Sequence, residues 1–97
     1  MKNLKVGICG WGNVATGLYK TINNNETQIL SNSNLVIDII AIGARRDNKK
    51  CNPENTIIER DIFDVLNHDI DVMVELIGGV EVARDLILQA INKGIHV

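Results

Sequence analysis

Apolar residues along this chain follow two patterns, short runs rich in β-branched side chains and longer stretches with helical spacing. The short runs predict strands at residues 4–9, 35–42 and 71–77, with a fourth strand beginning at 95–97. The helical spacing predicts helices at residues 13–23 and 61–67 and a last helix from about Glu81 to Lys93. Strands that alternate with helices in this way predict an α/β fold, in which helices flank a parallel sheet.

The first helix is marked by Val14, Leu18 and Ile22, which recur at helical spacing. Gly17 is expected to let this helix approach the sheet closely. The asparagine-rich segment 23–28 weakens the pattern, Ile29-Leu30 extends it, and residues 31–34 end it.

The second strand is the clearest of the chain, because its apolar run is nearly continuous rather than alternating. That pattern is typical of a parallel strand covered on both faces. Asp38 interrupts the run and is expected to mark the point where the chain enters the sheet. A polar loop with the single proline, Pro53, spans residues 43–55.

The length of 97 residues allows one domain at most, and 45% apolar with 23% charged residues is ordinary for a globular α/β protein. A net charge of −2 argues against nonspecific binding to nucleic acid. Apolar runs too short to span a membrane, and an N-terminus without a signal segment, predict a cytoplasmic protein. Cys9 and Cys51 have no spacing typical of a metal site or a disulfide framework.

A glycine-containing turn joins the first strand to the first helix. In the sequence Gly10-Trp11-Gly12-Asn13-Val14-Ala15, Gly10 permits a tight turn and Gly12 lets a pyrophosphate approach the backbone. The amides of Asn13 and Val14 then lie at the positive end of the helix, where an anion is bound. This is the dinucleotide fingerprint of a Rossmann-type fold, with Ala15 in place of the third glycine.

The residues after the second strand indicate which dinucleotide is bound. An NAD site usually carries an acidic residue there, but this chain has Arg45 and Arg46. A guanidinium group suits a 2′-phosphate, so the pattern favours NADP, with NAD as the alternative. Lys49 and Lys50 would add to the positive field.

The third strand ends in a second informative motif. Glu75 near the end of a buried strand requires a hydrogen-bond partner, and we interpret it as a structural acceptor. Gly78-Gly79, just beyond the strand, would allow a ring or carboxamide to approach the backbone closely.

Together these blocks resemble the N-terminal nucleotide-binding region of homoserine dehydrogenase. The resemblance lies in Gly10-Trp11-Gly12-Asn13-Val14, in the run from Asp71 to Gly79, and in Glu81, Ala83 and Gly94-Ile95-His96-Val97. It implies an NAD(P)-dependent enzyme that interconverts aspartate 4-semialdehyde and homoserine, in threonine and methionine biosynthesis. It also implies that Gly10, Gly12, Asn13 and Val14 hold the pyrophosphate, that Arg45 and Arg46 follow strand two, and that Gly78 and Gly79 lie near the nicotinamide.

In that family the catalytic lysine lies in a separate substrate domain, which this sequence does not include. We therefore expect an incomplete NAD(P)-binding domain over residues 1–97, without catalytic residues or a metal site, that is inactive alone and belongs to a homo-oligomeric enzyme. A relative of diaminopimelate dehydrogenase, or another two-domain NADP oxidoreductase, is one alternative. A stand-alone nucleotide-binding module is the other.

Overall fold

The computed structural model describes residues 2–46, 53, 56–77 and 80–97. Its strands are β1 (Lys2–Cys9), β2 (Leu35–Gly43), β3 (Ile57–Glu59) and β4 (Val72–Glu75). They form one sheet in the order β3-β2-β1-β4, and every pairing is parallel. The expected α/β architecture is therefore confirmed.

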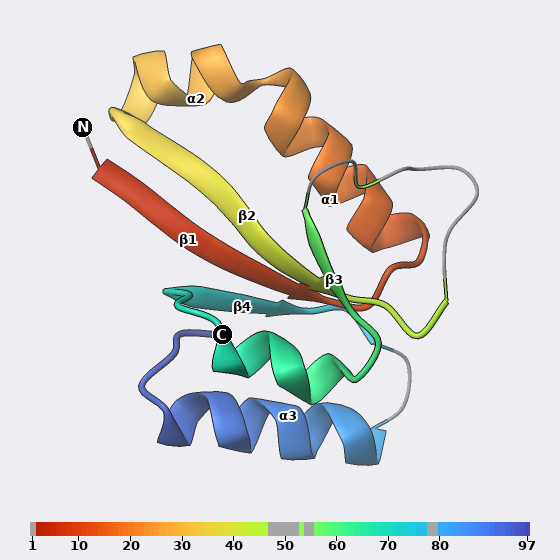
Figure 1. Cartoon of the computed structure of the whole chain (residues 1–97). Coiled ribbons are helices and arrows are strands. Elements are labelled where there is room, and N and C mark those ends of the chain that lie inside the picture. The colour runs from red at the N-terminus through yellow and green to blue at the C-terminus, as the bar shows by residue number, and fades with distance from the viewer. Residues whose placement is uncertain (1, 47–52, 54–55, 78–79) are drawn as a thin grey trace.

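The helices cover both faces of this sheet (Figure 1). On one face lie α1 (Asn13–Asn24) and α2 (Glu26–Ser33), and on the other lie the short 3₁₀ helix η1 (Ile62–Asn67) and α3 (Val80–Asn92). Because alternate residues of a strand point to opposite faces, the sheet divides the apolar side chains into two cores. The buried members of the α1 core are Val6, Ile8, Trp11, Ala15, Tyr19, Ile42 and Ala44. Those of the η1–α3 core are Cys9, Ala41, Val65, Leu66, Ile70, Met73, Leu86 and Ala90.

The first helical region is interrupted at Asn25, so two helices stand where one helix with an extension was expected. The Asn25 backbone (φ −114°, ψ 18°) is not helical, and its N–H donates to the Thr21 carbonyl at 3.1 Å. The Asn25 carbonyl then accepts from the Ile29 N–H at 2.9 Å, which starts α2. The end of this region is as expected, because Asn34 adopts a left-handed conformation (φ 54°).

The buried side of α1 differs from the expected one. Val14 is 70% exposed, whereas Ala15 is 1% exposed and packs in the core. Gly17 is also exposed, and no described atom lies within 4 Å of a Cβ built on it. The expectation that Gly17 brings the helix close to the sheet is wrong, and the small side chain of Ala15 takes that place instead.

The loop after β2 leads into a strand that the sequence did not predict. β3 has three residues, too few for a periodic pattern, and it pairs with the end of β2. Asp61 then caps η1 by accepting a hydrogen bond from the Phe63 N–H at 3.1 Å. The expected burial of Ile62, Val65 and Leu66 in that short helix is confirmed.

One further strand expectation is wrong and another is met by a single bridge. Asp38 lies in the middle of β2, paired with Lys5 of β1, and not where the chain enters the sheet. At the C-terminal end, His96 forms a single parallel bridge with Val72 beside β4. The Met73 N–H donates to the His96 carbonyl at 2.7 Å, so this segment runs alongside the edge of the sheet as expected.

Candidate functional site

The carboxyl ends of β1, β2 and β4 converge around Gly10. The Gly10 N–H donates to the carbonyl of Gly43, at the end of β2, at 2.8 Å. On the other side the Leu76 N–H donates to the Cys9 carbonyl at 2.9 Å, just beyond β4. In parallel sheets of this kind, ligands bind outside the carboxyl ends of the strands. The hydrogen bonds therefore place the glycine turn where a ligand is expected.

Gly10 is required by the fold itself. Its φ of +108° is a backbone conformation that residues with a side chain rarely adopt. A Cβ at this position would also lie 2.6 Å from the carbonyl oxygen of Leu76. Both the turn and the contact with the segment after β4 need a residue without a side chain.

Gly12 is not required in the same way. It caps the N-terminus of α1 in an extended conformation (φ −94°), and no described atom lies within 4 Å of a Cβ built on it. The Thr16 N–H donates to the Gly12 carbonyl at 3.0 Å as the first helical bond. The N–H groups of Asn13 to Ala15 come before this first bond, so the helix itself offers them no carbonyl acceptor.

The field at this end of α1 is positive. Among the described residues of its first turn none is acidic, and a helix N-terminus carries a partial positive charge. An exposed glycine in front of the first amides of the helix leaves room for a phosphate group at this point.

A cavity of about 280 Å³ opens beside this turn. Arg45 and Arg46 are exposed and form part of its lining. The cavity therefore brings together two parts of the site that are far apart in sequence, the glycine turn and the basic pair. Its lining residues are Gly10, Trp11, Gly12, Gly43, Arg45, Arg46, Ile62, Leu76 and Ile77.

The backbone at Ala44, just before the arginine pair, is fixed by hydrogen bonds. Ala44 is 3% exposed, and its N–H donates to the Glu59 carbonyl at 2.9 Å. Arg60 donates from Nη1 to the Ala44 carbonyl at 3.1 Å. These contacts come from the end of β3, so sequence reasoning, which missed that strand, also missed Arg60 as a support for Arg45.

Two aromatic residues beside the turn were also missed. Trp11, between the two glycines, packs edge to face against Tyr19, with ring centroids 5.4 Å apart and an interplanar angle of 83°. The Tyr19 hydroxyl donates to the Pro53 carbonyl at 2.9 Å. The available signal was the single Trp within the glycine motif and a Tyr two turns along the following helix.

The interpretation of Glu75 as a structural acceptor is confirmed. Its Oε1 accepts a hydrogen bond from the Ile77 N–H at 2.7 Å, which shapes the segment that leaves β4. Cys9, opposite Glu75 in the sheet, is fully buried and donates from Sγ to the Ile62 carbonyl at 3.7 Å. Burial, followed by the charge of Glu75, raises the pKa of the Cys9 thiol to about 12. A thiol in this state is not a nucleophile at neutral pH.

Some sequence predictions fall outside the described residues. These are the roles of Gly78-Gly79, Lys49, Lys50 and Cys51. Among the described residues there is no group of three or more His, Cys, Asp or Glu side chains that could hold a metal ion. No helix in the described part of the chain is long and apolar enough to cross a membrane.

Comparison with known proteins assigns the chain to a family. The family model for the NAD-binding domain of homoserine dehydrogenase matches residues 10–97. A homoserine dehydrogenase of Pseudomonas aeruginosa is 47% identical over 98 residues, which cover 100% of this chain and 23% of that protein. A homoserine dehydrogenase of Methylobacillus glycogenes is 34% identical over 100 residues, covering 100% of this chain and 24% of that protein.

Solved structures agree. The crystal structure of S. aureus homoserine dehydrogenase at pH 6.0 superimposes with a TM-score of 0.89 at 34% identity, covering 100% of this chain and 26% of that one. A homoserine dehydrogenase from Thiobacillus denitrificans gives a TM-score of 0.87 at 33% identity, covering 98% and 22%. The chain thus spans about a quarter of the length of the proteins it matches, with 23% for the first of them.

Proposed function

This chain belongs to the family of homoserine dehydrogenase NAD-binding domains, and from that premise we propose that it is the NADP(H)-binding part of a homoserine dehydrogenase. The observation that carries the proposal is the contrast between the two glycines of the turn. The fold explains Gly10, which has a positive φ and at which a Cβ would clash with the Leu76 carbonyl. It does not explain Gly12, which faces open space at the N-terminus of α1.

A pyrophosphate accounts for the open space at Gly12. A side chain there would stand between the ligand and the amides of Asn13 and Val14, which would hold the phosphate oxygens. Gly10 keeps the turn tight enough to point these amides outward. Gly78 and Gly79, assigned to the nicotinamide end by the family resemblance, remain predictions.

Arg45 and Arg46 are proposed to select NADP over NAD. They line the same cavity as the glycine turn. The Ala44 carbonyl, just before them, accepts a hydrogen bond from Arg60. A 2′-phosphate offers them a charge-assisted and bidentate contact that a ribose hydroxyl does not. The alternative within this proposal is comparable use of NAD, in which case the two side chains would remain solvated.

The reaction of the longer enzyme is proposed from the relatives' name. The reduced nicotinamide would supply a hydride to the aldehyde carbon of aspartate 4-semialdehyde, and addition of a proton to the oxygen would give homoserine, on the route to threonine and methionine. Residues 1–97 contribute the binding and orientation of the nucleotide, and no catalytic residue is assigned among them. We expect the longer enzyme to be a cytoplasmic homo-oligomer, and this chain alone to show no turnover of homoserine.

Calorimetric titration of the chain with NADP⁺, and separately with NAD⁺, tests the proposal. We expect saturable binding of NADP⁺ and weaker binding of NAD⁺, with a matching rise in melting temperature, because a ligand that binds only the folded state stabilises it. A folded chain that binds neither nucleotide would contradict the proposal. Equal affinities would contradict the role of Arg45 and Arg46 while leaving nucleotide binding intact.

A further inference from the structure

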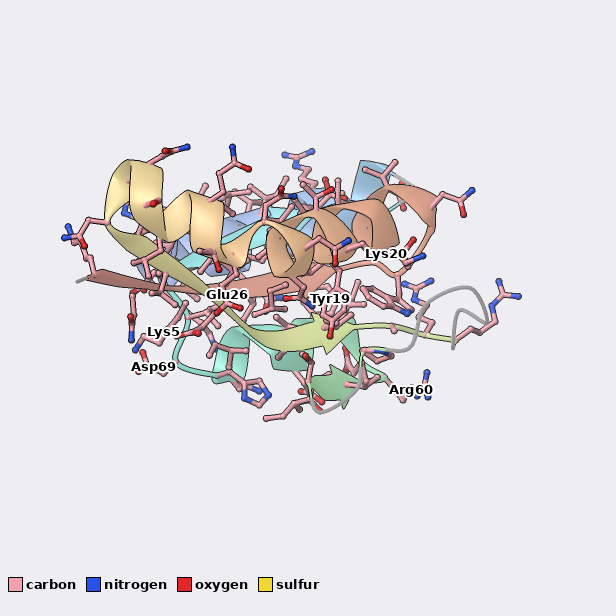
Figure 2. The ribbon with its side chains drawn as sticks, turned by 90° about the horizontal axis from the view of Figure 1, so that it is seen from above. Lys5, Tyr19, Lys20, Glu26, Arg60 and Asp69 are labelled. Atoms are coloured by element: carbon pink, nitrogen blue, oxygen red, sulfur yellow. The ribbon has the colours of Figure 1, made fainter. Side chains whose placement is uncertain are left out.

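Arg60 lies beside the point where the chain leaves the sheet toward Arg45 and Arg46. It directly follows β3 and is exposed, just beyond the tip of that strand on the side toward which β2 also points (Figure 2). Its Nη1 donates to the carbonyl of Ala44, 16 positions earlier in sequence, at 3.1 Å. The sequence analysis assigned no role to Arg60, yet its acceptor is the residue immediately before Arg45.

Ala44 is held at three points. Its methyl group belongs to the α1 core, and 3% of the residue is exposed. Its N–H donates to the Glu59 carbonyl at 2.9 Å, and its carbonyl accepts from Arg60. Because peptide groups are planar, each residue has only two soft dihedral angles, φ and ψ. The two hydrogen bonds hold the peptide groups on both sides of the Ala44 Cα, so together they set both angles.

The bond from Arg60 is the one that acts on Arg45. The Ala44 carbonyl and the Arg45 N–H belong to the same peptide group, so the Arg60 guanidinium fixes the direction in which the chain continues toward Arg45 and Arg46. Without this bond the peptide group could rotate about ψ of Ala44 while the bond to Glu59 stayed intact. The two arginine side chains would then sample more directions, and ordering them on an anion would cost more conformational entropy.

The residues on both sides of Arg60 are themselves anchored to η1. Before it, the Glu59 carboxylate pairs with His68 at the end of η1, with 3.0 Å between Oε2 and Nε2, and both side chains are mostly buried. After it, Asp61 caps the start of η1. An arginine on a fixed backbone loses less entropy on reaching an acceptor than one on a free backbone. The bond to Ala44 therefore starts from a backbone that is already in place.

We propose that Arg60 is a positioning residue that sets the preference for a 2′-phosphorylated adenine nucleotide, because its bond to the Ala44 carbonyl orients Arg45 and Arg46. The inference rests on the proposed function and deepens it, by adding a residue that governs specificity without touching the ligand. Of the described residues, Arg45 and Arg46 line the cavity beside the glycine turn and Arg60 does not. Arg60 acts on the nucleotide only through the peptide group that precedes Arg45.

The variant Arg60→Met removes the donated hydrogen bond and keeps a long unbranched side chain at an exposed position. Dissociation constants for NADP⁺ and NAD⁺ are measured by calorimetry in the wild-type chain and in the variant. Loss of one hydrogen bond should weaken NADP⁺ by about threefold to tenfold and leave NAD⁺ within about twofold, so the preference for NADP⁺ falls. A merely structural role would weaken both nucleotides alike.

Lys2→Met is the matched control for the loss of charge. Lys2 is exposed at the start of β1, at the opposite end of the sheet from the carboxyl ends that surround the cavity. Its replacement removes one cation, as Arg60→Met does, and leaves the contacts of Ala44 intact. Both dissociation constants should stay within about twofold of the wild-type values, because distant exposed charges are screened. A fall in NADP⁺ preference as large as that in Arg60→Met would show that net charge alone explains the effect, against the proposal.

Action through Arg45 and Arg46 is tested in a second background. In the Arg45→Ser/Arg46→Ser chain no guanidinium group is left for the Ala44 peptide to orient, so adding Arg60→Met should lower the preference for NADP⁺ by less than it does in the wild type. Residues that act as one unit give a non-additive double-mutant cycle. Full additivity would mean that Arg60 acts on the nucleotide independently, and it would overturn the proposal.

A measurement on the unmodified chain keeps the proposal testable if Arg60→Met fails to fold. In a chain labelled with ¹⁵N-arginine, adenosine 2′-monophosphate is titrated while the Nε resonances are followed by NMR. Those of Arg45 and Arg46 should move as the phosphate binds. The Arg60 resonance should move much less, because its guanidinium contacts a backbone carbonyl. An Arg60 shift as large as those of Arg45 and Arg46 would identify a direct phosphate contact and refute the positioning role.

The outcomes also separate this inference from the proposed function. A wild-type chain that binds neither NADP⁺ nor NAD⁺ overturns both. A wild-type chain that binds the two nucleotides equally leaves nucleotide binding intact and overturns the roles of Arg45, Arg46 and Arg60. A wild-type chain that prefers NADP⁺, together with an Arg60→Met variant that keeps the same preference or loses affinity for both nucleotides equally, overturns only the role of Arg60.

Discussion

The carbonyl oxygen of Leu76 lies 2.6 Å from the position that a Cβ on Gly10 would occupy. The turn after β1 is therefore in direct backbone contact with the segment that leaves β4. Two residues that are 66 positions apart in sequence fix each other, and the space beside them becomes the candidate site. The two glycines of the motif therefore differ: Gly10 is required by the fold, whereas Gly12 is open to a ligand.

Gly10→Ala is expected to destabilise the folded chain by about 2 kcal/mol or more, because the new Cβ meets both a disfavoured φ and the Leu76 carbonyl. Urea unfolding followed by circular dichroism measures the loss. An unfolding midpoint equal to that of the wild type would show that the turn can relax without the contact.

Gly12→Ala is the counterpart of Gly10→Ala that tests ligand binding rather than folding. Its Cβ meets no described atom within 4 Å and its φ of −94° suits alanine, so the free energy of unfolding should change by less than about 1 kcal/mol. Binding of NADP⁺, measured by calorimetry, should weaken by about tenfold or more, since the methyl group stands where the pyrophosphate approaches. Unchanged affinity would mean that no ligand comes close to Gly12.

Replacement of Arg45 and Arg46 by Ser should weaken NADP⁺ by about tenfold, while NAD⁺ changes little, because only NADP⁺ carries the 2′-phosphate. The difference should shrink as salt is added, since both side chains are exposed and their charges are screened. Competition titrations at low and high ionic strength measure both effects. Equal losses for the two nucleotides would reject the assignment.

Cys9 should be unreactive in the folded chain. With its pKa raised to about 12, almost no thiolate is present at pH 8. In a Cys51→Ser background, an aromatic disulfide reagent should label Cys9 at least about a hundredfold more slowly in buffer than in 8 M urea. Rapid labelling of the folded chain would show that β1 opens readily at its carboxyl end.

The raised pKa of Cys9 also predicts how the stability of the chain depends on pH. Because the folded pKa of Cys9 lies above its ordinary value of 9.0, the thiol favours folding below about pH 9. That contribution is lost as the pH rises from about 9 toward 12. The difference in free energy of unfolding between the wild type and Cys9→Ala should therefore narrow between pH 8 and pH 11. A constant difference would indicate that Cys9 titrates normally in the folded state.

Gly17→Ala is expected to stabilise the chain by about 0.5–1 kcal/mol, because alanine is the better helix former and the new methyl group has no described neighbour within 4 Å. Thermal unfolding should show a higher midpoint than the wild type. A lower midpoint would restore the original expectation that this glycine allows close packing.

The sequence predicted the local structure around the candidate site. Strand, glycine turn and helix are consecutive, and Arg45-Arg46 come two positions after the end of β2, so each signal depends on neighbours along the chain. Glu75 was also recognised as a structural acceptor, because a carboxylate in an apolar run needs a donor nearby and Ile77 is only two residues away. The short strand β3 was missed, since three residues carry no period and pair only through their partner, β2.

The sequence by itself determined the alternation of the longer strands and helices, the α/β class and the family, because hydrophobic period, turn residues and motif spacing are properties of neighbouring positions. Tertiary structure alone decided which side of α1 is buried, with Ala15 inside and Val14 outside. It also decided what lies against Gly10 and where the Tyr19 hydroxyl is bonded. The physical reason is the same in each case: these contacts join residues far apart in the chain, and they exist only once the sheet has brought the ends of its strands together.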